Sequence, residues 1–148
     1  MKSINAITVL FIVAVMGSAF AQAEEADDIK AKMKVNYEKM GEMLGNILLD
    51  ANWDQTIKDA ELLTKHAQAI KTLDSSRYTK DMPKSEYFES YALHLESSAH
   101  NLKVVAEEIE RERAAGAERS RYLRPNAAVF FGQTVSMCAN CHNQFRGQ

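Results

Sequence analysis

Two cysteines and a histidine near the end of this 148-residue chain have the residue types and spacing best suited to chemistry. Cys138 and Cys141 are three residues apart, and His142 follows the second cysteine directly. Residues three apart on a helix share a face, so both thiols can reach the two vinyl groups on one edge of a haem. His142 lies about 100° further round the helix and can bring its imidazole to the iron. The motif predicts one covalently bound haem c.

Other uses of this motif need residues that the sequence does not clearly supply. A structural zinc site needs a fourth ligand, for which His66, His94 and His100 are the candidates. A thioredoxin-like redox pair needs a preceding strand inside a βαβ unit, and no such pattern is visible. A local disulfide between the two cysteines is a third alternative.

The first residues predict export. A charged start at Lys2 is followed by a short apolar core and by small residues suited to cleavage after Ala21 or Ala23. An uncleaved anchor is the alternative, but the apolar core is shorter than the ~20 residues that a membrane span needs. We therefore expect a signal peptide over 1–23, a single domain over 24–148, and a location in the periplasm.

The charge and the apolar pattern after the leader exclude two kinds of partner. The 17 basic and 20 acidic residues that remain are interleaved, so no basic patch predicts nucleic-acid binding. No segment after the leader is apolar enough to predict a membrane span. No hydrolytic triad or similar cluster is recognisable, so the sequence does not predict an enzyme.

Most of the chain after the leader repeats at the helical period, and it predicts four helices. The first is expected from Asp27 or Asp28 to about Asp50, and the second begins after an N-cap at Asn52 or Asp54. A loop is expected from Thr72 to Lys84, a third helix after a cap at Ser85, and a last helix from Pro125 or Asn126. The expected inward positions are, in chain order, Ile29, Met33, Tyr37, Met40, Leu44 and Ile47; Ile57, Ala60, Leu63, Ala67 and Ile70; Phe88, Tyr91, Leu95, Ser98, Leu102, Val105 and Ile109; and Phe131, Val135, Cys138, Cys141, His142 and Phe145.

Four amphipathic helices in about 125 residues predict an all-α fold, most simply an antiparallel four-helix bundle with the haem on its C-terminal helix. A haem motif at the end of such a chain, followed by Phe145 and Arg146, resembles the class II c-type cytochromes, the cytochrome c′ superfamily. The resemblance implies a haem held by Cys138, Cys141 and His142 inside the bundle. It also implies that a homodimer through the first two helices is possible.

The resemblance implies that function depends on the sixth iron ligand. The first-helix pattern, with Met33 followed by Met40 and then Gly45, looks like that of the low-spin branch, in which the first methionine is the ligand. A methionine at the same spacing can also be an ordinary core residue that does not bind iron. Met40, Tyr37 or no ligand at all therefore remain alternatives. Five-coordinate relatives commonly have an arginine one turn before this position, where the present chain has Ile29.

Two functions follow from these alternatives. With His142 and Met33 as axial ligands, the protein is expected to carry single electrons between periplasmic redox proteins. With His142 alone, the resemblance implies a five-coordinate haem protein that binds small gases such as NO or CO.

Overall fold

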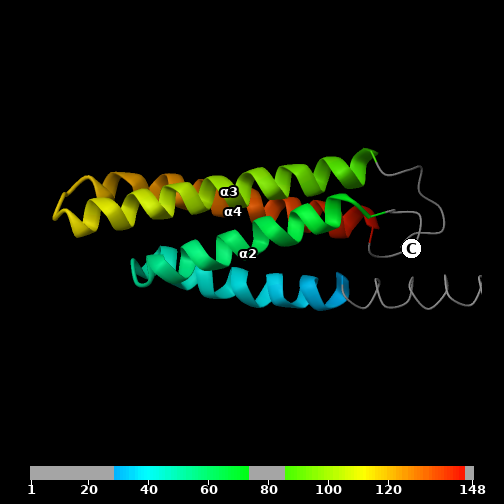
Figure 1. The fold of residues 1–148 in the computed structure, drawn as a ribbon, viewed down its shortest axis with the longest axis horizontal. Helices are drawn as coiled ribbons and strands as arrows, with labels where there is room; N and C mark the ends of the chain where they lie inside the picture. Colours follow the sequence, from blue (N-terminus) through cyan, green and yellow to red (C-terminus); the bar gives the residue numbers. More distant parts are fainter. Residues whose placement is uncertain (1–28, 74–85, 146–148) are drawn as a thin grey trace, which may run out of the picture. The chain divides into compact units, whose positions relative to one another are not determined.

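Helices make up all the regular structure in the part of the chain described by the computed structural model, residues 29–73 and 86–145 (Figure 1). These ranges contain no strand and four helices: residues 29–49, α2 (Trp53–Lys71), α3 (Glu86–Ala114) and α4 (Ser120–Phe145). The all-helical prediction is confirmed. The signal peptide, the start of the first helix, most of the Thr72–Lys84 loop, the Ser85 cap and Arg146 lie outside the described residues.

The chain divides into two units, residues 1–34 and 35–148, and each is described by itself. Residues 29–34 of the first unit are helical. The second unit contains residues 35–49 and helices α2, α3 and α4. None of the described helices combines the length and the apolar character needed to cross a membrane.

Within the second unit, consecutive helices run antiparallel (Figure 1). Between α2 and α3, Lys103 Nζ lies 3.4 Å from Glu61 Oε2, and Gln68 Nε2 donates to Glu96 Oε1 at 2.9 Å. Later positions in α2 therefore contact earlier positions in α3, as in an antiparallel pair. Between residues 35–49 and α2, Lys39 Nζ lies 3.6 Å from Asp59 Oδ1, and Asn36 contacts His66. Together, these two contacts show that this pair of helices is also antiparallel. The short α3–α4 connection returns α4 beside α3.

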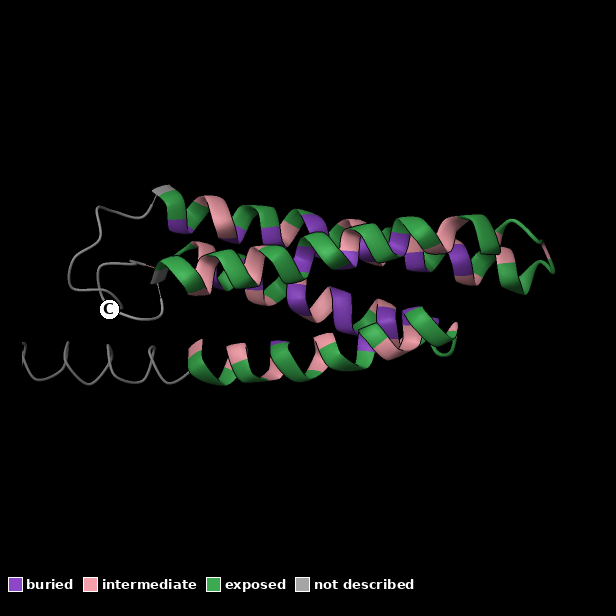
Figure 2. Ribbon diagram, turned by 180° about the vertical axis from the view of Figure 1, so that it is seen from behind, coloured by how far each residue is buried: buried purple, intermediate pink, exposed green. Residues whose placement is uncertain are grey.

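Buried positions recur along α3 (Figure 2), and their side chains alternate between large and small at heptad spacing. The large residues are Phe88, Leu95, Leu102 and Ile109. The alanines between them are Ala92, Ala99 and Ala106. The large residues and Ser98 are buried as predicted. Tyr91 is half-buried, and Val105 is half-buried and packs against the core, as an inward position should. Alanine occupies the neighbouring seam positions, where a methyl group lets the adjacent helix approach closely.

The buried face of helix 29–49 differs from the predicted one. In residues 35–49, the inward positions are Asn36, Met40, Met43 and Ile47, of which Met40 is partly buried. Tyr37 and Leu44 were wrongly placed on this face, since they are 76% and 43% exposed. The prediction followed apolar residues alone, whereas the helix buries the polar Asn36 because its side chain finds a partner on α2.

Asp50 closes the turn between helix 29–49 and α2. It adopts a positive φ of 53°, which aspartate tolerates better than most residues. Its Oδ1 accepts a hydrogen bond from the indole of buried Trp53 at 2.7 Å, and its Oδ2 lies 3.1 Å from Arg124 Nη1 of α4. Asn52 is the N-cap of α2, as one of the two predictions had it, with Oδ1 accepting from Gln55 N at 3.0 Å. On α2, Ala60, Leu63, Ala67 and Ile70 are buried as predicted, and Ile57 is half-buried.

The start of α4 was wrongly predicted. The helix begins at Ser120, and Pro125 lies inside it. Proline fits the helical φ, and near a helix start it removes only one backbone hydrogen bond, which the burial of Ala127 and Phe131 in the core can offset. Val135 was also wrongly expected on the inner side. It is 39% exposed, and Thr134 is the buried residue at this level.

We expect Leu102→Ala to lower the free energy of unfolding by about 2–5 kcal/mol, because Leu102 is fully buried at the centre of the core and its removal leaves a cavity. Chemical denaturation followed by far-UV circular dichroism measures the change. Leu93→Ala on the same helix is the matched control: Leu93 is 50% exposed, so its loss should stay within about 0.5 kcal/mol. Equal losses in the two variants would contradict the assignment of the core.

Candidate functional site

The two cysteines of the motif continue the inward face of α4. Ala127, Phe131 and Thr134 are buried on this helix, at spacings of four and three. Cys138 and Cys141 follow at four and three again, so they extend the same stripe toward the end of the helix. Both are free thiols and both are half-buried. The structure thus gives the thiols the common inward direction that attachment to one porphyrin edge requires.

The side chains that lie level with the thiols are apolar, and several are small. Ser98 of α3 contacts Thr134 of α4, so Leu95 and Ala92 lie at about the level of Cys138 and Cys141. On α2, the buried residues at this end of the bundle are Ala67 and Ile70. All four are buried but do not belong to the main core cluster, which occupies the other part of the bundle. The buried members of that cluster are Met43, Ile47, Trp53, Ala60, Leu63, Ala99, Leu102, Ala106, Ile109, Ala127 and Phe131.

Burial raises the pKa of both thiols to about 11, and the neighbouring Cys138 adds a smaller upward contribution to the pKa of Cys141. At neutral pH, both sulfurs are therefore uncharged in the folded, haem-free chain. A thioether sulfur is also uncharged and suits such surroundings, whereas zinc is bound by thiolates. The two thiols therefore fit covalent attachment of a haem, and a metal ion bound there would have to displace their protons.

The zinc alternative finds no fourth ligand in the described part of the chain. Residues 29–73 and 86–145 contain no group of three or more His, Cys, Asp or Glu side chains placed to hold a metal ion. His94 and His100 are exposed on α3. His66 is half-buried and directs Nδ1 at Asn36.

The candidates for the axial ligands lie on different elements. His142 is half-buried on α4, directly after Cys141. Met33 is a helical residue of the first unit. Met40 packs against the main core cluster, which gives it a structural role, and Tyr37 is largely exposed.

A layer of polar side chains crosses the bundle next to the cysteines, and only Ser98 of its members was expected inside. Asn36 Oδ1 lies 2.6 Å from His66 Nδ1, and Thr134 Oγ1 lies 3.2 Å from Ser98 Oγ. Asn36 is 2% exposed and Thr134 is fully buried. Asn36 lies four and seven residues before Met40 and Met43, which is the spacing of one helix face. A search restricted to apolar residues does not use this signal, because asparagine is polar.

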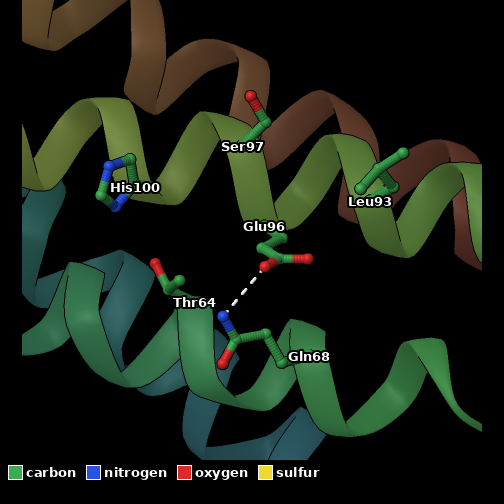
Figure 3. Close-up of a pocket in the computed structure, with 6 residues that line it drawn as sticks. All are labelled: Thr64, Gln68, Leu93, Glu96, Ser97 and His100. Carbon is green, nitrogen blue, oxygen red and sulfur yellow. Dashed lines mark hydrogen bonds between the residues drawn. The ribbon is translucent and has the colours of Figure 1, made fainter.

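The described surface also has an open groove of about 380 Å³ between α2 and α3 (Figure 3). Its lining residues are Thr64, Gln68, Leu93, Glu96, Ser97 and His100. Glu96 is already paired there, since its carboxylate accepts from Gln68 and from Lys71. Those two contacts lower the pKa of Glu96, the Gln68 hydrogen bond being the larger cause. The groove holds none of the residues of the cysteine–histidine motif.

Comparison with known proteins adds no family to these observations: no protein-family model, no curated protein and no solved structure matches this chain. The site is therefore interpreted from its own residues.

We expect the thiols of the haem-free protein to react slowly with iodoacetamide at pH 8, since the thiolate is the reactive form and a pKa of about 11 leaves very little of it. The rate should rise with pH through this range and level off only above it. Unfolding the protein in denaturant is the control, and it should restore reaction at the ordinary pH of a cysteine. Fast alkylation of the folded protein at pH 8 would show that the thiols are not buried as described.

Proposed function

We propose that this protein is a monohaem c-type cytochrome that transfers single electrons, with His142 and Met33 as axial ligands. The observation that carries the proposal is the pair of uncharged, half-buried thiols on the inward face of the last bundle helix, with His142 next to them. The haem supplies a one-electron redox centre when bound. The chain's part is to hold, orient and shield it.

Each part of the site has a role in this proposal. Cys138 and Cys141 form thioether bonds to the porphyrin, so retention does not depend on affinity alone. His142 binds the iron through its imidazole. The apolar residues level with the thiols limit access of water, and a low local polarity is one of the factors that tune the potential of a bound iron.

Met33 is proposed as the sixth ligand from the register of its helix. The inward positions 36, 40, 43 and 47 alternate at spacings of four and three, and the next position of this pattern toward the N-terminus is 33. A thioether ligand opposite histidine raises the reduction potential and suits electron transfer. Residue Tyr37 is one position away from this pattern and is largely exposed, so we do not propose it.

Two features from the sequence complete the proposal. The position of the haem motif at the end of a helical bundle is similar to that of the class II c-type cytochromes. The leader predicted over 1–23 supports a periplasmic location, where haem c is attached and where redox partner proteins would exchange electrons with it.

Expression with a c-type maturation system should yield a red protein whose haem stays bound during acid-acetone extraction, because thioether bonds survive this treatment. The expected pyridine haemochrome spectrum is that of a haem with two thioethers, and mass spectrometry should show one haem per chain. The double variant Cys138→Ala/Cys141→Ala should release its haem. Extraction of haem from the wild type would contradict the proposal.

The ferric wild-type protein should show a low-spin spectrum with the weak charge-transfer band of a methionine–iron bond. Met33→Ala should lose this band, because it removes the proposed sulfur ligand. Met40→Ala is the matched control and should keep the band, since Met40 packs against the core. A wild-type protein with high-spin iron that binds CO readily would favour the five-coordinate, gas-binding alternative.

A further inference from the structure

Asn36 has a buried hydrogen-bond donor without a partner in the described structure. The side chain is 2% exposed, and its Nδ2 makes no hydrogen bond. Its Oδ1 faces His66 Nδ1 at 2.6 Å, and because a carbonyl oxygen only accepts, the ring nitrogen donates. Nδ2 is therefore the end of the amide that is available to another group. A buried amide N–H without a partner is costly, so such a group needs an explanation.

The unpaired amide lies at the level of the bundle that adjoins the thiols. Gln68 and Glu96 face each other across α2 and α3 (Figure 3). Because the two helices are antiparallel, His66 and Ser98, each two residues away along its own helix, lie at the same level. Ser98 in turn contacts Thr134 on α4. Asn36, His66, Ser98 and Thr134 thus form one layer, and Cys138 follows Thr134 by a single helical turn, a rise of about 6 Å.

We propose that Asn36, held by His66, donates a hydrogen bond from Nδ2 to a propionate carboxylate of the haem. This inference rests on the proposed function, since it requires a haem at Cys138 and Cys141. Under that function both axial positions of the iron are filled by protein ligands, so the two carboxylates are the strong hydrogen-bond acceptors that the haem brings. A carboxylate that leaves water for a buried position needs such a donor.

The contact with His66 gives the amide its orientation. It fixes Oδ1 toward α2 and leaves Nδ2 directed elsewhere. The second buried atom that lacks a partner, Asp59 Oδ2, differs because its carboxylate already accepts from Gln55 and lies near Lys39. Asn36 is the unpaired group in the layer next to the cysteines.

The test is a pH titration of the carboxyl carbons of carbon-13-labelled haem in the loaded protein, followed by NMR. A hydrogen bond to the ionised carboxylate lowers its pKa, so Asn36→Leu should raise the pKa of one propionate by about one unit. Thr134→Val is the matched control from the same layer. The Thr134 hydroxyl already donates to the Phe130 carbonyl at 2.9 Å, so this variant should leave both propionates unchanged.

The titratable side chains near the layer are His66 on α2 and Glu96 and His100 on α3. Lys39 of helix 29–49 is also charged and pairs with Asp59. The labelled carbons report the propionates themselves and are not confused with these groups. A second measurement needs no variant: the Asn36 amide protons of the ferrous wild type should shift with the same pH midpoint as one carboxyl carbon.

The outcomes separate the two proposals. A wild type without thioether-bound haem would overturn the proposed function. A loaded wild type whose propionates titrate identically in Asn36→Leu, and whose Asn36 amide protons do not follow them, would overturn this inference alone.

Discussion

The alternation of large residues and alanine along α3 is the constraint on which the rest of the bundle depends. α2 and α4 both pack against α3, and the alanines at 92, 99 and 106 let a neighbouring backbone approach between the larger side chains. Close approach fixes the rotation of each neighbour about its own axis. On α4 this rotation turns Ala127, Phe131 and Thr134 inward, and Cys138 and Cys141 follow because they share the same stripe. The direction of the thiols is thus set by packing several turns away.

The sequence was most reliable where chemistry and helical periodicity agreed. The helical class, the α2 face and the inward placement of the cysteines all follow from spacing, and the structure agrees with them. The errors about which residues face inward share one cause, since each came from assuming that apolar residues occupy the inward positions. Tyr37 and Val135 are exposed, while Asn36 and Thr134 are buried beside polar partners. Partners on other helices cannot be read from one helix alone, so these positions required the structure.

The start of α4 shows a different limit. Pro125 is a strong local signal for a helix start, and the helix nevertheless begins at Ser120. Here long-range contacts outweigh the local preference, because Leu123 packs against the core and Arg124 pairs with Asp50. The proposed sixth ligand is a similar question, since it depends on which residue of one helix lies opposite a residue of another. Sequence spacing alone left Met33, Tyr37, Met40 or no ligand as alternatives.

Asp50 links the turn between helix 29–49 and α2 to α4, because it contacts both Trp53 and Arg124. The main core cluster fills the same end of the bundle. The buried residues around the thiols lie outside that cluster, so fewer mutual apolar contacts hold the cysteine end together. Local stability in a protein follows such differences, and the less supported end opens first. The two ends of the bundle therefore differ in local packing, and the cysteine end is expected to open more readily than the end at Asp50. Under the proposed function, such opening would let the thiols meet the porphyrin before they are enclosed, and attachment of the haem would complete the folding of this end.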